Sequence, residues 1–304
     1  MDKKDQIYTL IKRTGLLYTI DNFKNILNVI LDNVFNTPKL DSYINKRIRT
    51  CPGTISSIDT LRGIEELCVI RDYVDSYLLI RKLRDNLFLD LFLFESQKTF
   101  EKYPDYGFDD INLNDAEEVF EALNKFNLRC VDIETCNDEL KAINNWKSNK
   151  LLMSNKNKDK DNYFKFSKYL EYLTKNNKDF GLCYNNFLKK RFDNLSLKLN
   201  DYTHSNSEST LNNNKNQVST FTDIKATLKE LEHLFLVSLF FVDSTLFASE
   251  DYVDCMECGI APQEGSQYWV NGFILEAFVD IKLESEELFS FLLEHNNNFM
   301  EIDV

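Results

Sequence analysis

The chain has 304 residues, enough for one large domain or two ordinary ones. Its 49 Asp and Glu residues exceed its 36 Lys and Arg residues, and the net charge of −13 disfavours binding to nucleic acid or to an anionic membrane over a broad surface. Only 8 Gly and 4 Pro accompany 24 Phe and 14 Tyr. So few turn residues cannot separate the strands of a large β-sandwich, and the composition therefore predicts long helices.

The first hundred residues are expected to be helical, with breaks at two turns. Helices are predicted over 3–13 and 21–36, and Pro38 lies just beyond the second. Cys-Pro-Gly-Thr at 51–54 predicts a turn. One very long helix is then expected over 57–100, with a single interruption near Gly63.

The middle of the chain predicts two further helical pairs. An inserted pair is expected over about 104–150, because Asn114 is a suitable N-cap and Glu117 follows at the capping-box spacing. A second pair is expected over 163–174 and 185–202. The last of these carries one apolar stripe at helical spacing, formed by Leu188, Phe192, Leu195, Leu199 and Tyr202. The polar segment 205–220 predicts a flexible loop.

The last part of the chain contains the most apolar run of the sequence. Thr222 is predicted to be the N-cap of a helix that ends near residue 247. The run 234–247 contains Asp243 and is shorter than the roughly 18–20 residues that a bilayer requires, so we expect a buried core helix and no membrane partner. Two short helices are predicted to close the chain, over 273–278 and 285–294.

These elements predict an all-α fold, a helical bundle with an inserted helical pair and a short C-terminal extension. The bundle is expected over 51–258, preceded by a helical segment at 1–50 and followed by an extension at 259–304 that packs on it. The seven Cys residues are irregularly spaced, and no apolar leader opens the chain. Free thiols in a reducing cytoplasm are the simplest interpretation.

The segment 73–95 is apolar almost all round, yet it carries charged residues on a face that the pattern predicts to be buried. Arg81 and Asp85 fall in the middle of that face, and Arg84 lies on its flank. The same face holds Val74, Leu78, Phe88 and Phe92, whereas the predicted solvated stripe is formed by Asp75, Lys82, Asn86 and Asp90. A buried Arg and Asp are costly unless they are paired, so Arg81 and Asp85 indicate either a functional site or an i,i+4 ion pair that fixes the helix register.

A second candidate group lies near the predicted end of helix 185–202. The sequence Leu-Asn-Asp-Tyr-Thr-His at 199–204 includes Asp201 and places His204, one of only three His residues, just before the flexible loop. The negative end of a helix favours the protonated imidazole. If His204 meets Arg81 or Arg84 between helices, the group is suited to RNA cleavage without a metal ion. The His would transfer protons, Arg would stabilise the phosphate charge, and Asp85 would orient the Arg.

The sequence Arg-Lys-Leu-Arg-Asp-Asn within one helix, followed by a helix ending in Leu-Asn-Asp-Tyr-Thr-His, resembles HEPN-type helical domains. The resemblance implies a bacterial defence protein of the abortive-infection or toxin type, with a metal-independent RNase site. The family's mark is an Arg and a His on one helix with four to six residues between them, whereas Lys198 stands six before His204 here and the nearest Arg on that helix is Arg191. This departure leaves open a member that binds RNA without cutting it. The alternative is a non-catalytic helical interaction or scaffold protein, with a protein partner or with copies of itself in a homo-oligomer.

No motif predicts a cofactor or a metal ion. Cys255 and Cys258 form one isolated CxxC, short of the four ligands of a zinc site, and are expected to be small residues at a helix end. Tyr268 and Trp269 lie in a turn that is expected to pack the C-terminal extension on the bundle, and they could anchor a partner. The acidic residues near 105–118 and 284–287 lack calcium-loop spacing and are expected to be solvated. Scarce glycine disfavours the phosphate loops of ATPases, kinases and dinucleotide-binding enzymes.

Overall fold

The computed structural model describes residues 3–36, 51–98, 165–203, 217–249 and 269–295, together with Tyr252 and Ile302. His204, the predicted inserted pair, residues 205–216 of the predicted loop, the CxxC motif and Tyr268 lie outside this part of the chain. The predicted loop is wrong at 217–220, which are helical. The elements in chain order are α1 (Lys3–Thr14), α2 (Leu16–Asn36), α4 (Pro52–Ile70), α5 (Tyr73–Lys98), α8 (Phe166–Asn176), α9 (Lys178–Cys183), the π-helix η4 (Tyr184–Leu188), α10 (Lys189–Thr203), α12 (Gln217–Asp243), the 3-10 helix η5 (Ser244–Phe247), α14 (Gly272–Glu284) and α15 (Glu286–Glu294).

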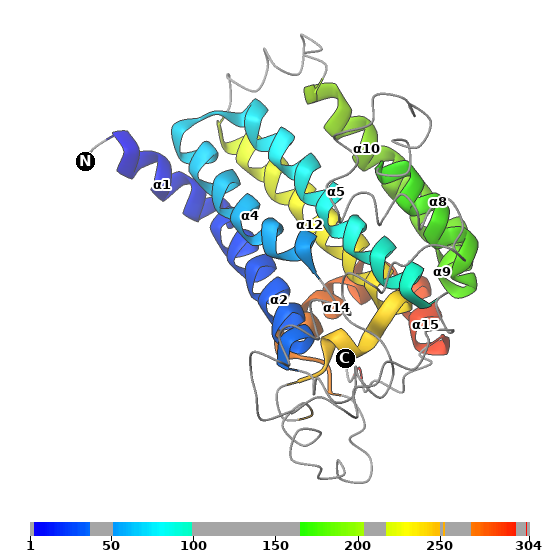
Figure 1. Ribbon diagram of the computed structural model, residues 1–304. Coiled ribbons are helices and arrows are strands. Elements are labelled where there is room, and N and C mark those ends of the chain that lie inside the picture. Colours follow the sequence, from blue (N-terminus) through cyan, green and yellow to red (C-terminus); the bar gives the residue numbers. More distant parts are fainter. Residues whose placement is uncertain are drawn as a thin grey trace, which may run out of the picture.

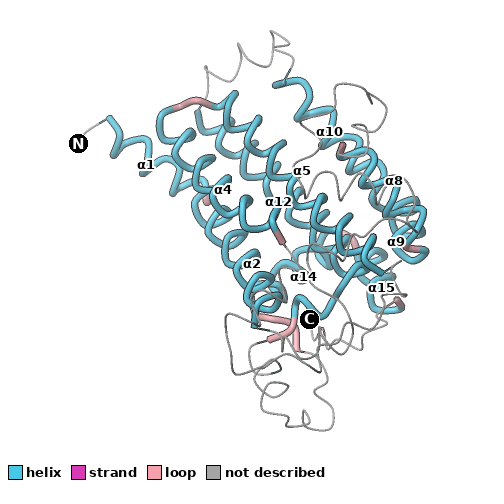
Figure 2. Tube along the Cα trace, viewed as in Figure 1, coloured by secondary structure: helices cyan, strands magenta, loops and turns pink. Residues whose placement is uncertain are grey.

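The fold is all-α, as predicted (Figures 1 and 2). Helices α2, α4, α5 and α12 lie side by side, α8 and α10 flank α5, and α14 and α15 lie at the lower end of the bundle in Figure 1. Among the residues described, extended structure is confined to one isolated bridge between Ala248 and Val270, which joins the end of η5 to the start of the C-terminal helices.

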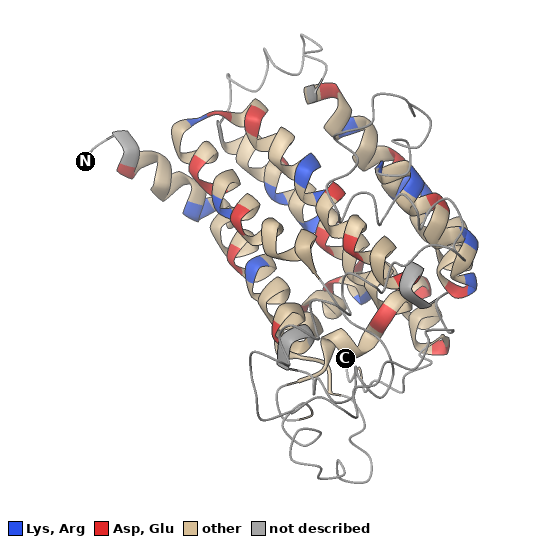
Figure 3. Ribbon diagram, in the orientation of Figure 1, with Lys and Arg blue, Asp and Glu red and all other residues tan. Residues whose placement is uncertain are grey.

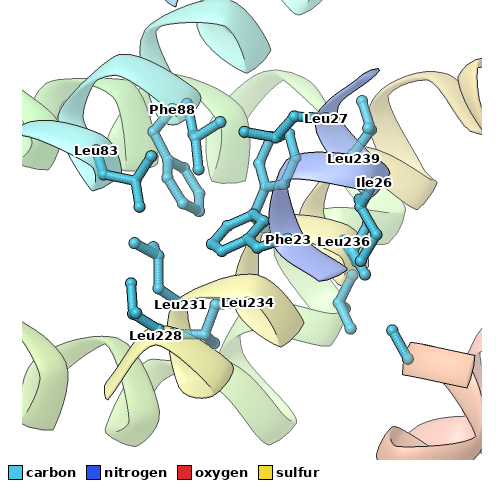
Figure 4. Packing of buried hydrophobic residues seen from close by; sticks show 14 of the residues in the cluster. Phe23, Ile26, Leu27, Leu83, Phe88, Leu228, Leu231, Leu234, Leu236 and Leu239 are labelled. Carbon is cyan, nitrogen blue, oxygen red and sulfur yellow. The ribbon is translucent and has the colours of Figure 1, made fainter. Parts of the chain in front are cut away.

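The core is centred on α5 and α12. Figure 4 shows Leu83 and Phe88 of α5 and Phe23 of α2 directed toward the leucines of α12. The ring of Phe88 makes edge contacts with Phe166, Phe192 and Phe235, which belong to α8, α10 and α12. One α5 side chain thus contacts three helices, and aromatic contacts of this geometry add specificity to the apolar burial.

The prediction of one helix over 57–100 is wrong, because the chain turns between α4 and α5. Arg71 adopts the left-handed conformation with φ 68°, and its N–H donates to the carbonyl of Cys68. The N–H of Asp72 donates to the carbonyl of Leu67, which completes a Schellman-type helix end. Glycine normally occupies such a position, so Arg71 gave no turn signal, whereas Gly63 lies within α4.

The α12 helix begins earlier than predicted, but its apolar run is buried as predicted. It begins at Gln217, and the hydroxyl of Thr222 donates back to the carbonyl of Val218 within the helix, so Thr222 is not the N-cap. Residues 231–240 are all buried, which confirms the prediction of a core helix. Within the described ranges, no helix combines the length and the apolar character needed to cross a membrane.

The segment leading to His204 is continuously helical and consists of α9, η4 and α10. The predicted helix over 185–202 therefore begins inside a π-turn, whose extra residue shifts the helical phase. The predicted apolar stripe is nevertheless confirmed, because Leu188, Phe192, Leu195, Leu199 and Tyr202 are all buried. The C-terminal helices are confirmed at 272–284 and 286–294, with α14 longer than predicted.

The solvated stripe predicted on α5 is wrong at Asp90, which is 1% exposed. Its carboxylate accepts hydrogen bonds from the backbone N–H groups of Gly53 and Thr54, at the first turn of α4. The two helices approach so closely that a Cβ on Gly53 would lie 2.1 Å from the carbonyl oxygen of Asn86. The predicted buried stripe is also wrong at Leu78, which is 36% exposed.

Candidate functional site between α5, α10 and α12

Arg84 is the buried cation of the predicted site. Its side chain is 5% exposed, and its Nε and Nη2 both donate to Oδ1 of Asp85, at 2.9 and 2.7 Å. Nη1 donates to the hydroxyl oxygen of Ser196 on α10 at 3.3 Å, and the guanidinium carbon lies 4.0 Å from the ring centroid of Phe166 on α8. Burial lowers the pKa of Arg84, and the charge of Asp85 opposes that shift. Arg84 therefore joins three helices.

This geometry corrects the predicted i,i+4 pair. The cation bound to Asp85 and buried in the bundle is Arg84, the next residue in the chain, whereas Arg81 is only half-buried. Asp85 is itself 41% exposed. It neutralises Arg84 from the solvent side, so only one member of the pair bears the full cost of burial.

A second polar cluster lies about two turns away at the start of α5. The ring of Tyr77 stacks on Tyr202 of α10, with centroids 3.7 Å apart and an angle of 3° between the planes. The Tyr77 hydroxyl donates to Asp223 of α12, whose other oxygen accepts from Nζ of Lys198 at 2.6 Å. Burial, followed by the hydrogen bond to Asp223, raises the pKa of Tyr77 well above its ordinary value and keeps the phenol neutral.

The contacts between α5 and α10 define an antiparallel register. Phe88 contacts Phe192, Arg84 contacts Ser196 and Tyr77 contacts Tyr202. Arg81 follows Tyr77 by four residues, about 6 Å along the helix axis at 1.5 Å per residue. His204 follows Tyr202 by two residues and lies outside the described ranges.

The predicted site residues therefore separate into two levels. Arg84 lies at the level of Ser196, in the interior of the bundle, and Asp85 binds it from the solvent side. Arg81 lies between that level and the end of α10. Lys198, which stands six residues before His204, binds Asp223, and Asp201 is exposed.

Sequence reasoning missed a second charged network, between α10, α12 and α14. Arg191 donates through Nε and Nη2 to the two carboxylate oxygens of Glu230, at 2.8 and 2.6 Å. Its Nη2 also lies 3.3 Å from Oε2 of Glu284, and the same oxygen lies 3.1 Å from Nδ1 of His233. The hydrogen bond from His233 is the main reason that the pKa of Glu284 lies below its ordinary value.

The network continues through the most buried charged residue of α12. Glu232 has no exposed surface, and its Oε1 lies 3.1 Å from Nζ of Lys229, which also binds Asp280 of α14 at 2.9 Å. Burial raises the pKa of Glu232. Oε2 of Glu232 and Nε2 of buried His233 have no hydrogen-bond partner among the described residues. The available signal was a Glu and a His inside an apolar run, the same kind of break that identified Arg81 and Asp85.

The described residues contain no group of three or more His, Cys, Asp or Glu side chains placed to hold a metal ion. Cys51, Cys68 and Cys183 are buried and form no disulfide, and burial raises the pKa of Cys68 to about 11 and that of Cys183 to about 12. Trp269 of the aromatic turn is 47% exposed and lies beside the bridge between Ala248 and Val270.

In the comparisons with known proteins, the chain matches no family model, no curated protein and no solved structure.

Proposed function

We propose that the chain is a bacterial defence protein of HEPN type that cleaves RNA in the cytoplasm without a metal ion. His204 transfers the proton and Arg81 stabilises the charge that develops on the phosphate. Arg84 and Asp85 hold α5 against α8 and α10. The absence of a disulfide at the buried Cys51, Cys68 and Cys183 fits a reducing compartment.

The observation that carries the proposal is the stack of Tyr77 on Tyr202. It brings the end of α10, which leads directly to His204, against the first turns of α5. Arg81 is one turn further along α5, about 6 Å along the helix axis from Tyr77. This arrangement supports Arg81 as the cation that acts with His204.

The contacts of Arg84 make it unsuited to this role. Nε, Nη1 and Nη2 of Arg84 all donate to partners within the fold, and its guanidinium lies against Phe166. A phosphate would have to displace Asp85 or Ser196 to reach it. Arg84 is therefore assigned a positioning role.

The test is incubation of cellular RNA with purified protein in the presence of a chelator. We expect cleavage by the wild type and a loss of about 10²–10⁴-fold in His204→Ala, the usual contribution of a general acid or base. Arg81→Ala is also expected to be impaired. His295→Ala and Arg62→Ala are the matched controls, because His295 ends α15 and Arg62 is an exposed residue of α4 paired with Asp59. A cleavage rate that is unchanged in His204→Ala would refute this site.

A second candidate function is a non-catalytic helical interaction protein. The observation that favours it is that two cations of α10 form ion pairs with α12: Lys198 binds Asp223, and Arg191 binds Glu230. These two cations, the ones nearest before His204 in the sequence, are therefore already bound to carboxylates within the fold. RNA binding without cleavage, or a homo-oligomer of defined mass in light scattering together with no RNA binding, would favour this candidate.

A further inference from the structure

The segment 165–203 has the largest excess of positive charge among the described segments. It contains eight Lys and Arg residues against four Asp and Glu residues, whereas the whole chain has 36 Lys and Arg against 49 Asp and Glu. Blue segments recur along α8, α9 and α10 at the right-hand edge of Figure 3. At the other extreme, α14 and α15 carry Lys282 alone against six acidic residues.

Most of these positive charges face solvent. Arg191 and Lys198 are bound to Glu230 and Asp223 across the helix interface. The other six are exposed, and we call them the lysine face: Lys165, Lys168, Lys175, Lys178, Lys189 and Lys190. Arg191 and Lys198 are therefore neutralised within the fold, and Lys168 pairs with Glu171 on the surface. Because the six exposed lysines outnumber the four acidic residues of the segment, an excess of positive charge remains on the outside of α8, α9 and α10.

We propose that the lysine face is the surface that binds the phosphate backbone of RNA. This inference rests on the proposed function, because it names the docking surface for that substrate. Charge complementarity carries it: a chain with net charge −13 repels a polyanion, and binding requires a local surface of opposite sign. Lys189 and Lys190 begin α10, whose last residue, Thr203, precedes His204 in the sequence. The exposed charged residues between Lys190 and Thr203 are Asp193 and Asp201, so the lysine face covers the start of α10 and not its end.

The lysine face makes contacts with phosphates and not with bases. Lysine ammonium groups are strongly hydrated point charges on flexible stems, which suits contacts to a backbone of any sequence. Binding is therefore expected to depend steeply on salt and weakly on RNA sequence. Each contact to a single strand adds about 0.7 to the slope of the logarithm of affinity against the logarithm of salt concentration.

The test is fluorescence anisotropy of a labelled single-stranded RNA with full-length protein carrying His204→Ala, so that the RNA stays intact. Lys189→Glu with Lys190→Glu is the test pair, since both residues are exposed on the first turn of α10 and Glu preserves helix propensity. Lys12→Glu with Arg13→Glu is the matched control. It makes the same change in net charge at two adjacent exposed residues of α1. Thermal melting of each variant checks that the fold is retained.

We expect the test pair to weaken binding about tenfold at low salt and to reduce the salt slope by about 1.4, the value for two lost contacts. The control pair is expected to weaken binding by less than about threefold through its effect on net charge. Equal weakening by both pairs, or RNA binding that is insensitive to the test pair, overturns the lysine face and leaves the proposed function standing. No RNA binding by any of the proteins at low salt overturns both.

Discussion

Asp90 of α5 holds the first turn of α4 through Thr54, whose backbone N–H and hydroxyl both donate to Oδ2, at 2.6 and 2.7 Å. The other carboxylate oxygen accepts from the N–H of Gly53 at 2.9 Å. Cys51, the residue at the N-cap of α4, makes no side-chain cap, so the cap is supplied by the neighbouring helix. This contact fixes how α4 and α5 lie along each other.

Asp90→Ala is expected to lower the free energy of unfolding by about 3 kcal/mol. The change leaves two N–H groups of α4 buried without an acceptor, and each such group costs about 1–3 kcal/mol. Denaturant unfolding measures the loss. Asp59→Ala is the control, because Asp59 is an exposed α4 residue paired only with Arg62, and its effect should stay within about 0.5 kcal/mol. Similar losses in the two variants would show that Asp90 does not cap α4.

Asp90 is also expected to make the free energy of unfolding fall as the pH rises. Burial raises the pKa of Asp90 from 3.8 to about 7, while the three hydrogen bonds oppose that shift. A raised pKa means that the folded state holds the proton more tightly than the unfolded chain does. Its contribution to stability is therefore complete below about pH 4 and is lost as the pH rises through about 7.

Comparison of the wild type with Asp90→Asn isolates this contribution. The free energy of unfolding of the wild type is expected to fall more between pH 5 and pH 8 than that of the variant, which has no group to titrate at residue 90. Denaturant unfolding at the two pH values provides the measurement. Parallel pH profiles would contradict a raised pKa for Asp90.

The Arg84–Asp85 pair is expected to respond unequally to loss of each partner. Asp85→Leu leaves a buried guanidinium without its anion and should cost roughly 3–5 kcal/mol. Arg84→Met keeps the apolar stem and leaves only a half-exposed carboxylate, so a loss of about 1 kcal/mol is expected. Thermal and denaturant unfolding report both values.

The exposed pair Arg62–Asp59 on α4 is the control for this asymmetry. Arg62→Met and Asp59→Leu should each change the free energy of unfolding by less than about 0.5 kcal/mol. If the melting temperature of Asp85→Leu equals that of the wild type, water or another group neutralises Arg84.

Much of the fold followed from composition and helical spacing, since the chain contains few breakers and α10 has one clean apolar stripe. The sequence pattern did not predict correctly which residues of α5 are buried. This helix packs against α4, α8, α10 and α12, so apolar residues occur all round it and no single period defines its buried side. For that reason the pattern placed Arg81 in the interior in place of Arg84, and Asp90 in solvent.

Local sequence pattern predicted only those residues of the candidate site that interrupt an apolar helix. Arg84 and Asp85 were identified because charges interrupt an apolar helix, and Ser196 had no comparable signal because it is a small polar residue at a helix contact. The network of Arg191, Glu230 and Glu284 is assembled from three helices, so it depends on tertiary packing.

Replacement of Glu284 tests whether its ion pairs with Arg191 and His233 attach α14 to the bundle. Its Oε2 receives both Arg191 and His233, and the hydrogen bond from His233 lowers its pKa. A lowered pKa contributes stability that is present above the ordinary carboxylate range and is lost as the pH falls through the folded-state value. Glu284→Gln should therefore cost about 1 kcal/mol near pH 7, a value that allows for the half-exposed carboxylate, and less in acid.

Glu287→Gln supplies the matched control, since Glu287 is an exposed residue in the first turn of α15 and its replacement should leave stability unchanged to within about 0.5 kcal/mol. Denaturant unfolding at pH 7 and pH 4 compares the two variants with the wild type. If the cost of Glu284→Gln were the same at both pH values, the carboxylate charge would have no part in holding α14, and the packing of Ile274, Phe278 and Ile281 would have to account for its attachment.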